Sequence, residues 1–336
     1  MSIPTTTPAV ASIHAGPVDA TGSFVDITLD VTPPTGHDLL VEVHAVSVNP
    51  VDGKVRACFD PQDEPKVLGW DAAGVVLAVG PEVTGYTAGD EVFYAGSIAR
   101  SGSNAGLQLV DERIVGRKPA TLDFAEAAAL PLTSITAWEV LYERLHLTPE
   151  STGTLLVVGG AGGVGSMLTQ LARRIPGVTV VATASRPETA DWVRSMGAHH
   201  VVDHHHLVEL VREVAPDGVD WIFTAFSEGN VAAFADLLKV RGEVVAIDDP
   251  VGLDLLALKT KSITWHWELM FTVPLFEPAS TAQRQLLDEV SRLVDAGELR
   301  TTLTQRLSPL SADTLREAHR HVESSSTIGK VVLTIG

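Results

Sequence analysis

Three glycines at a fixed spacing are the residues in this chain that point most directly to chemistry. Gly160, Gly162 and Gly165 form the pattern G-x-G-x-x-G, after an apolar, β-branched run and at the start of a helical pattern. In such a strand–turn–helix frame, we expect Gly160 to make the tight turn and Gly162 to let the backbone approach a pyrophosphate. Gly165 would let the helix pack closely on the strand, while the N–H groups of the helix start, at Gly163 and Val164, would face the anion. The pattern predicts a dinucleotide site, and a glycine-rich structural turn is the alternative.

The end of the next predicted strand bears on which dinucleotide binds. Proteins that bind NAD usually carry Asp or Glu there, to accept a hydrogen bond from the ribose 2′-hydroxyl. Here the strand at 178–182 leads to Ser185 and Arg186, and the first acid is Glu188. A hydroxyl and a guanidinium suit a 2′-phosphate, because Arg binds phosphate oxygens with two N–H groups. We therefore expect NADP(H) rather than NAD, and the alternative for Arg186 is a solvent-facing residue that opens a helix.

These motifs lie where strands and helices alternate. We predict strands at 154–158, 178–182, 200–203, 219–225, 243–247 and 262–267, with helical patterns between them. This alternation is typical of a doubly wound parallel sheet with right-handed crossovers, as in Rossmann domains. Phe226 and Ile247 follow the fourth and fifth of these strands, at the carboxyl ends where open α/β sheets bind ligands.

The two ends of the chain have a different pattern. Residues 1–125 contain short strand candidates, at 25–31, 39–48, 74–79 and 91–93, separated by Gly and Pro turns, which is typical of a small barrel or sandwich. The end of the chain predicts helices over 282–296 and 312–323 and a strand over 330–335. A six-stranded nucleotide domain has no place for these elements, so we expect them to fold back onto the N-terminal part. The predicted fold class is α/β, with domains at 127–267 and at 1–126 together with 268–336.

Composition excludes several classes of protein. The 336 residues are 45% hydrophobic and 20% charged, which is ordinary for a globular protein. The formal net charge of −18 repels phosphate backbones and anionic lipid, so we expect neither nucleic acid nor a membrane as partner. The single cysteine, Cys58, excludes a disulfide framework and a multi-cysteine metal site within the chain. Residues 1–10 lack the pattern of a secretory signal, and we expect a cytoplasmic protein.

Several further motifs, in this order along the chain, resemble one superfamily. They are Asn49-Pro50-Val51-Asp52, Leu68–Gly74, Ala88–Val92, Thr136–Glu139, Gly159–Gly165, Met196–Ala198 and Gly329–Leu333. Together they resemble the medium-chain dehydrogenase/reductase superfamily, and most closely its quinone oxidoreductase (zeta-crystallin-like) branch. The segment 258–270 and the C-terminus resemble proteins often labelled "zinc-type alcohol dehydrogenase-like". The resemblance implies a GroES-like, β-rich catalytic domain beside the Rossmann domain.

The same resemblance argues against zinc. Zinc members carry a Cys near positions 49–52, a His-Glu pair at 70–71 and a four-Cys lobe after 96, where this chain has Asn49, Asp52, Trp70-Asp71 and no cysteine. A catalytic zinc ion needs three protein ligands of N, S or O type, so we expect no metal. The run 203–206, Asp-His-His-His, is an alternative site, but consecutive histidines point in different directions. We interpret this run as solvated residues at a helix start, and the resemblance implies that His204 approaches the adenosine phosphate.

Without a metal, the protein lacks the Lewis acid that would stabilise an alkoxide. The expected acceptor therefore delocalises its charge, as a quinone or an α,β-unsaturated carbonyl does. By resemblance, Asn49 and Asp52 lie beside the nicotinamide. Lys54 follows them, where several zinc-free enone reductases carry Lys, and would donate a hydrogen bond to the acceptor oxygen. The alternative for Lys54 is a surface lysine paired with Asp52, and Arg56 is a weaker candidate for the same task.

The resemblance assigns two more residues to the cofactor. Thr136 matches a family threonine that faces the nicotinamide, and the alternative is an ordinary helix N-cap. Lys330 matches a family lysine near the cofactor phosphates, and the alternative is an exposed charge at the start of an edge strand. In this fold the sixth strand tends to pair with its mate, so Trp265 and Trp267 motivate a homodimer through 262–267.

We therefore predict an NADPH-dependent, zinc-independent reductase of quinones or α,β-unsaturated carbonyls. The alternatives are a zinc-type alcohol dehydrogenase and a non-catalytic, crystallin-like protein that binds NADPH.

Overall fold

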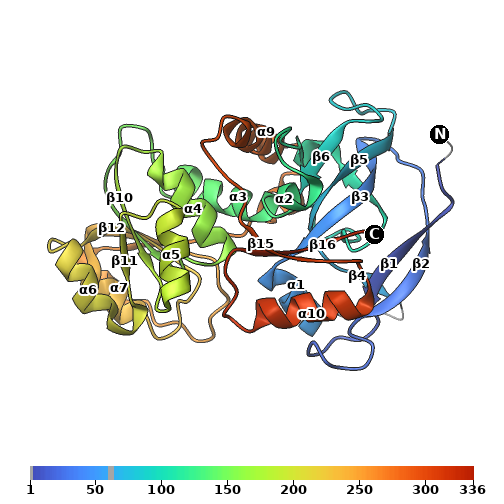
Figure 1. Ribbon diagram of the computed structural model, residues 1–336. Helices are drawn as coiled ribbons and strands as arrows, with labels where there is room; N and C mark the ends of the chain where they lie inside the picture. The colour runs from blue at the N-terminus through green and yellow to red at the C-terminus, as the bar shows by residue number, and fades with distance from the viewer. Residues whose placement is uncertain (1–2, 60–63) are drawn as a thin grey trace. The chain divides into compact units, whose positions relative to one another are not determined.

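A parallel sheet lies in residues 136–270 of the computed structural model, which describes residues 3–59 and 64–336 of the chain (Figure 1). Its strands are β9 (Thr152–Val158), β10 (Gly177–Thr183), β11 (His200–Val202), β12 (Val219–Thr224), β13 (Leu238–Ala246) and β14 (Thr264–Trp267). Across the sheet they follow the order β11-β10-β9-β12-β13-β14, and neighbouring strands are all parallel. The strand order reverses between β9 and β12. This arrangement confirms the predicted doubly wound sheet.

Helices cover both faces of this sheet. They are α4 (Gly163–Arg173), α5 (Pro187–Ser195), α6 (Leu207–Val214) and α7 (Val231–Leu237). The same unit also contains the short helices η2 (Glu139–Arg144), η3 (His204–His206) and η4 (Leu256–Lys261). Right-handed crossovers place α4 and α5 on one face, and α6 and α7, which contact each other, on the opposite face. The strands are apolar on both faces for this reason, and Leu156, Ile222 and Val244 are fully buried.

The remaining described residues form a β-rich unit. Its larger sheet has the order β15-β16-β3-β5-β6-β8, with β7 also paired to β3, and its smaller sheet has the order β2-β1-β4. These strands are β1 (Thr6–Ser12), β2 (Val25–Asp30), β3 (Asp38–Val48), β4 (Lys66–Val67), β5 (Asp71–Val79), β6 (Glu91–Tyr94), β7 (Leu107–Asp111), β8 (Val115–Arg117), β15 (Leu303–Leu307) and β16 (Lys330–Thr334). β16 pairs antiparallel with the end of β3, which joins the last strand of the chain to the N-terminal sheet. The C-terminal elements therefore fold back onto the N-terminal part, as predicted.

Helices pack around this β-rich unit. They are α1 (Pro50–Cys58), the 3₁₀ helix η1 (Glu112–Ile114), α2 (Phe124–Ala128), α3 (Pro131–Trp138), α8 (Thr272–Phe276), α9 (Ala282–Asp295) and α10 (Ala312–Glu323). The bounds of α10 agree with the prediction, because apolar Leu315 and Ala318 face the core and the Ser311 hydroxyl accepts the N–H of Thr314 at the helix start.

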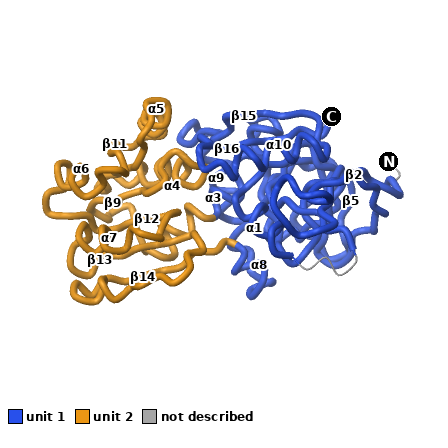
Figure 2. The backbone as a smooth tube through the Cα atoms, turned by 90° about the horizontal axis from the view of Figure 1, so that it is seen from below, with its two compact units in different colours: residues 1–135, 271–336 blue, residues 136–270 orange. Residues whose placement is uncertain are grey.

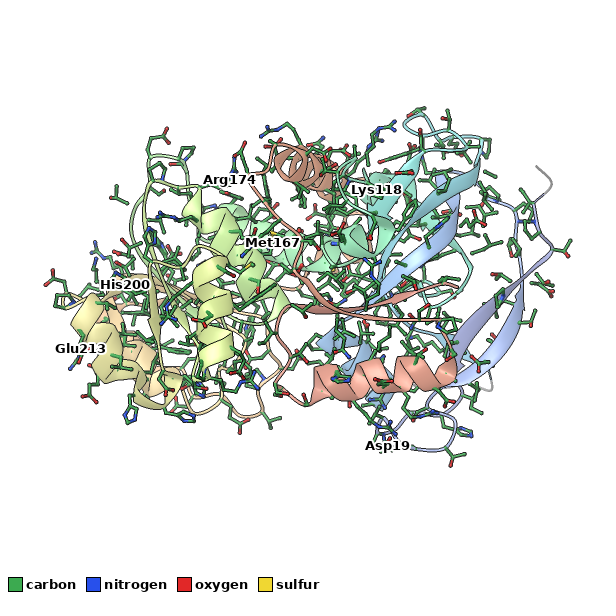
Figure 3. The ribbon with its side chains drawn as sticks, viewed as in Figure 1. Asp19, Lys118, Met167, Arg174, His200 and Glu213 are labelled. Atoms are coloured by element: carbon green, nitrogen blue, oxygen red, sulfur yellow. The ribbon has the colours of Figure 1, made fainter. Side chains whose placement is uncertain are left out.

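The chain divides into two compact units, residues 1–135 with 271–336 and residues 136–270 (Figure 2). The predicted domain boundaries, after 126 and 267, lie slightly earlier in the chain. Residues 127 and 128 belong to α2, which packs on β3 and β5 and so stays with the β-rich unit. Charged side chains such as Asp19 and Glu213 extend outward (Figure 3), in keeping with the acidic composition. Among the described residues, no helix combines the length and the apolar character that crossing a bilayer requires.

Candidate active site

The glycine turn joins β9 to α4 and leaves little room for side chains at two positions. A Cβ on Gly165 would lie 2.4 Å from the Gly159 carbonyl oxygen, so only glycine lets α4 begin this close to β9. A Cβ on Gly160 would lie 3.0 Å from the Ala182 Cβ. The left-handed residue of the turn is Gly159, with φ of +89°, and not Gly160, to which the spacing argument assigned the tight turn.

Gly162 differs from its neighbours in a way that indicates a ligand. Its φ of −72° is ordinary, and the nearest atom to an added Cβ would be the Gly159 oxygen at 3.6 Å. Packing within the protein therefore does not require glycine here. Gly162 is also the N-cap of α4, and within the described chain no side chain caps this helix. The first-turn N–H groups, at Gly163 and Val164, can thus bind an anion, and a dinucleotide pyrophosphate fits this position.

The residues after β10 lie at the surface. Ser185 is exposed, and Arg186 is the N-cap of α5, where its N–H donates to Thr189 Oγ1 at 3.1 Å. The Arg186 guanidinium is 3.2 Å from Glu188 Oε1, with both side chains partly exposed. A 2′-phosphate at this position would compete with Glu188 for the guanidinium. Arg186 thus opens a helix and also places a cation at the surface that follows β10.

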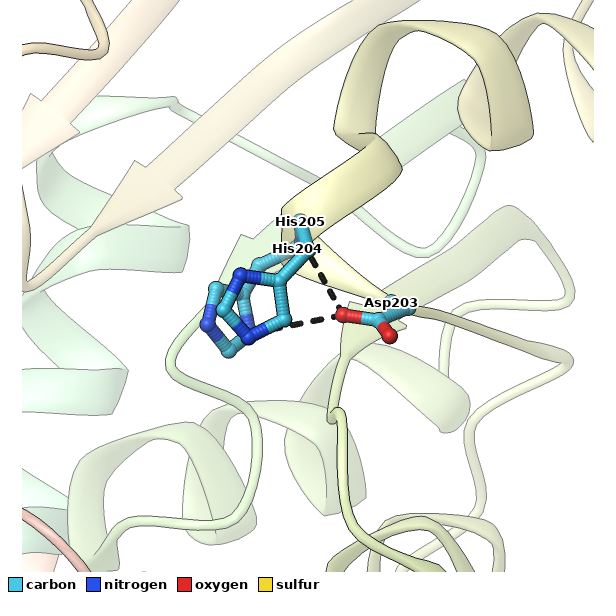
Figure 4. Close-up of side chains that lie close together, drawn as sticks. All are labelled: Asp203, His204 and His205. Carbon is cyan, nitrogen blue, oxygen red and sulfur yellow. Dashed lines mark hydrogen bonds and ion pairs between the residues drawn. The ribbon is translucent and has the colours of Figure 1, made fainter.

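The histidine run follows β11 in the chain, and Figure 4 shows its first three residues, Asp203, His204 and His205. Asp203 caps the 3₁₀ helix η3 by accepting the N–H of His205 at 2.9 Å, and the rings of His204 and His205 are 4.2 Å apart. Among the described residues, Asp203, His204 and His205 are the one group of His, Cys, Asp or Glu side chains whose ligand atoms lie close enough together for a metal, within 4.8 Å. Both histidines are exposed, in keeping with solvated residues at a helix start.

Three predicted cofactor residues remain, of which two follow strands and one lies inside a helix. Phe226 follows β12 and is 51% exposed, and Ile247 follows β13 and donates its N–H to the Thr224 oxygen at 3.1 Å. Thr136 lies inside α3 and is buried, which excludes the alternative that it is a helix N-cap.

In the β-rich unit, Asn49 and Asp52 form the start of α1. Asn49 is the N-cap, Pro50 occupies the first turn, and the Asn49 N–H donates to Asp52 Oδ2 at 2.9 Å. The Asn49 amide nitrogen donates to Asp71 Oδ2 at 2.7 Å, so α1 is tied to the first residue of β5. Asp52 Oδ1 is buried and, among the described residues, has no hydrogen-bond partner.

Lys330 completes this cluster from the first residue of β16. Its side chain is 4% exposed, so the alternative of an exposed charge at an edge strand is wrong. The Lys330 ammonium donates to the Val48 oxygen at 2.9 Å and to Asn49 Oδ1, and it lies 3.2 Å from Asp71 Oδ2. These groups use the three N–H donors of the ammonium. The predicted contact of Lys330 with a cofactor phosphate stays a prediction, and it would require one of these bonds to be exchanged.

Burial shifts the proton affinities of this cluster. Loss of hydration raises the pKa of Asp52 to about 7, although the Asn49 N–H and the Lys330 ammonium both favour its ionised form. Desolvation also raises the pKa of Asp71 and lowers that of Lys330. One ammonium is enclosed with two carboxyl groups, so the cluster is neutral when one carboxyl keeps its proton. Asp71 has the ammonium and two N–H donors on its oxygens, which favour its ionised form more than the single N–H donor on Asp52 favours that of Asp52.

Lys54 and Arg56 point to different environments from the same helix. Lys54 is exposed. Arg56 is 1% exposed and donates to the Gly16 oxygen at 2.7 Å and to Glu323 Oε1 at 2.6 Å, which ties α1 to α10. Arg56 thus forms a structural ion pair, and the prediction that it could donate a hydrogen bond to the acceptor oxygen is wrong.

Asp71 belongs to this cluster but was not among the site residues predicted from the sequence. An acid inside the apolar segment Trp70–Val76 was the available signal, because a carboxyl group is buried only when it is paired or protonated. Its partners Asn49 and Lys330 come from distant parts of the sequence, and no local spacing connects them.

Two family models match the chain. Residues 35–130 match the alcohol dehydrogenase GroES-like domain, and residues 196–333 match the zinc-binding dehydrogenase domain. A "zinc-type alcohol dehydrogenase-like protein" of Staphylococcus aureus (strain MSSA476) is 42% identical over 313 residues, which cover 90% of this chain and 92% of that protein.

The chain is also similar to a relative whose name states an activity, and to a solved structure. The "NADPH-dependent alkenal/one oxidoreductase, chloroplastic" of Arabidopsis thaliana is 32% identical, covering 88% of this chain and 71% of that protein. A crystal structure from Rhizobium etli CFN 42, whose name assigns it provisionally to the zinc-dependent alcohol dehydrogenases, superposes with a TM-score of 0.94. It is 52% identical, and the match covers 98% of both chains.

Proposed function

This chain belongs to the medium-chain dehydrogenase/reductase superfamily of oxidoreductases, and from this premise we propose that it is an NADPH-dependent, zinc-independent reductase of quinones or α,β-unsaturated carbonyls. The observation that carries the proposal is the Asn49–Asp71–Lys330 cluster, since hydrogen bonds and an ion pair between protein groups occupy the positions that correspond to metal ligands in zinc members. The cofactor, when bound, supplies the hydride, and the protein orients the reactants and stabilises charge.

The glycine turn and the residues after β10 support NADPH as the cofactor. Gly162 leaves space for a close approach and α4 presents uncapped N–H groups, which together suit a pyrophosphate. Arg186 supplies the cation that a 2′-phosphate requires, and Ser185 supplies a hydroxyl. The name of the Arabidopsis relative, which describes that protein as NADPH-dependent, supports the same choice of cofactor.

Zinc, which the names of several relatives mention, does not fit the residues at this position. Trp70 donates its indole N–H to a backbone carbonyl, and an indole is not a metal ligand. Asp71 accepts from the Leu132 N–H at 2.8 Å and from Asn49 at 2.7 Å, and it lies against the Lys330 ammonium. A zinc ion here would displace that ammonium and gain one carboxylate, whereas catalytic zinc needs three protein ligands. We therefore assign no step to a metal. The names themselves favour a zinc-type alcohol dehydrogenase as the second candidate.

An acceptor with delocalised charge suits a site without a Lewis acid. We propose that the exposed Lys54 ammonium donates to the acceptor oxygen as negative charge develops there. Burial raises the pKa of Asp52 to about 7. Asn49 positions both carboxyl groups, because its backbone N–H donates to Asp52 and its side-chain amide donates to Asp71.

Steady-state NADPH oxidation tests the proposal. We expect turnover with 1,4-benzoquinone or a short enone, and little oxidation of simple alcohols with NADP⁺. Alcohol oxidation that requires zinc would support the second candidate instead. NADPH binding without turnover of any of these acceptors would favour a non-catalytic, crystallin-like protein.

We also propose a homodimer through β14. This strand forms the edge of the parallel sheet, and its end carries Trp267, 53% exposed, next to Leu269, 50% exposed. An uncovered edge with large apolar side chains is stabilised by pairing with a second copy. Light scattering that gives only the monomer mass at micromolar concentration would contradict this. The compartment we propose is the cytoplasm, where the single exposed Cys58 would stay reduced.

A further inference from the structure

Asp203, His204 and His205 bring one carboxyl group and two imidazole rings together at the surface (Figure 4). The ring centroids of the two histidines are 4.2 Å apart, and the ring planes are inclined at 38°. His204 Nδ1 lies 4.0 Å from Asp203 Oδ1, and one ligand atom of each residue lies within 4.8 Å of those of the other two. The expectation that consecutive histidines point in different directions is therefore wrong for His204 and His205, whose rings lie side by side.

Hydrogen bonds fix the backbone that carries this group. The Ala184 N–H donates to the Val202 oxygen at 3.0 Å, which ties the residue before Asp203 to the chain that follows β10. Asp203 Oδ1 accepts the His205 N–H at 2.9 Å, and the Asp203 backbone oxygen accepts the His206 N–H at 3.1 Å. The Asp203 side chain is half-buried, while both imidazole rings of the group are exposed. The rings thus extend from a fixed backbone and are open to an ion in solution.

Two imidazoles and one carboxylate suit a particular class of ion. Imidazole nitrogen is a preferred ligand of Zn²⁺, Ni²⁺ and Cu²⁺, whereas Mg²⁺ and Ca²⁺ prefer oxygen ligands alone. A tetrahedral Zn²⁺ binds nitrogen and oxygen at about 2.0–2.2 Å, so its ligand atoms are about 3.4 Å apart. The ligand atoms of the group therefore have to approach one another by up to about 1.4 Å, and rotation of exposed side chains provides this movement.

The carboxylate can bind an ion without releasing the turn. Asp203 Oδ1 keeps its bond to the His205 N–H while Oδ2 binds the ion, because a carboxylate has lone pairs on both oxygens. The formal net charge of −18 also raises the local concentration of cations at the surface of the protein.

We propose that Asp203, His204 and His205 bind one divalent ion of the zinc, nickel and copper class, with water completing its coordination. This inference is independent of the proposed function. It assigns no catalytic step to the ion, and its residues belong to the unit formed by 136–270, whereas the buried cluster described above belongs to the β-rich unit. Zinc bound to the protein would then lie at an exposed group, from which a chelator can remove it.

Calorimetric titration of the whole chain with Zn²⁺, without an affinity tag, tests the inference. We expect saturable binding of one ion per chain. His204→Ala and His205→Ala should each weaken binding by about tenfold or more, because each removes a ligand. His206→Ala removes the next histidine of the same run, which lies outside the group, and is the matched control that should keep the wild-type affinity. Wild-type affinity in a protein that lacks both His204 and His205 would overturn the inference, as would an equal loss for His206→Ala.

Asp203 needs a conservative replacement, because its carboxyl group also caps η3. Asp203→Asn keeps an oxygen that can accept the His205 N–H, so the metal-free variant should keep the wild-type unfolding temperature and lose about tenfold or more in Zn²⁺ affinity. Visible absorption of bound Co²⁺ gives a second readout, which an excess of Mg²⁺ should leave unchanged. Wild-type Zn²⁺ affinity of Asp203→Asn, or displacement of Co²⁺ by Mg²⁺, would overturn the proposed set of ligands.

Discussion

Replacing Asp52 by asparagine is expected to stabilise this protein at alkaline pH, although it alters a buried residue. Burial raises the pKa of Asp52 to about 7, from 3.8 for an ordinary Asp. Between these two values the folded protein holds a proton that the unfolded chain has lost. The free energy of unfolding therefore falls as pH rises through this window, by about 1.4 kcal/mol per pH unit. The stability linked to this proton is fully present below pH 3.8 and lost by about pH 7.

The size of the effect follows from the same two values. The difference of 7 − 3.8, or 3.2 pH units, corresponds to about 4 kcal/mol at pH 8. The side chain of Asp52→Asn cannot ionise, and its amide oxygen can still accept the Asn49 N–H. We therefore expect the variant to exceed wild type by only about 1 kcal/mol at pH 4.5 and by up to about 4 kcal/mol at pH 8.

Urea unfolding followed by tryptophan fluorescence, at several pH values from 4.5 to 8, measures this difference. Asp30→Asn, which changes an exposed carboxyl group at the end of β2, is the control and should keep the pH dependence of wild type. An Asp52→Asn protein that is less stable than wild type at pH 8, or whose free energy of unfolding keeps the wild-type slope with pH, would contradict a raised pKa of Asp52.

Further substitutions test other parts of the account. Arg186→Ala should raise the KM for NADPH about 10- to 100-fold and leave that for NADH nearly unchanged, because a charge-assisted phosphate contact contributes roughly 1.5–3 kcal/mol; equal effects on both cofactors in steady-state kinetics would contradict the assignment. Gly165→Ala places a Cβ 2.4 Å from a carbonyl oxygen and should lower the unfolding temperature measured by calorimetry. Gly162→Ala should fold normally and lose about tenfold or more in NADPH affinity measured by fluorescence titration. A Gly162→Ala protein that unfolds at a lower temperature but keeps the wild-type NADPH affinity would refute the role of Gly162. Lys330→Met leaves Asp71 buried without its cation and should cost roughly 3–5 kcal/mol in urea unfolding at pH 8, and a loss under about 1 kcal/mol would contradict the described cluster.

The parallel sheet could be predicted because its strands are apolar runs with simple local signals. β9 and β12 were placed to within two residues, since Leu155–Val158 and Ile222–Thr224 are buried on both faces. β13 was predicted to begin at 243 but begins at Leu238. Its first half, Lys-Val-Arg-Gly, reads as a turn, and Arg241 has a positive φ where the pairing with β12 shifts register. A bulge of this kind interrupts the strand pattern without ending the strand.

The buried cluster could be predicted only in part. Asn49 and Asp52 are three residues apart at a helix start, so their neighbourhood is local. Lys330 lies 281 positions from Asn49, and the bond between them depends on β16 pairing with β3. The sequence around Lys330 does not distinguish an exposed lysine from a buried one. The hydrogen bonds from Ser227 to Asp248 could not be predicted for the same reason, since they join the ends of two neighbouring strands.

The most direct test of the account combines zinc content with turnover. The protein is treated with a strong chelator, its zinc content is measured by mass spectrometry, and the initial rate of NADPH oxidation with 1,4-benzoquinone is compared before and after. For a zinc-independent reductase we expect an unchanged rate with far less than one zinc ion per chain. A rate that disappears on chelation and returns with added zinc would contradict it.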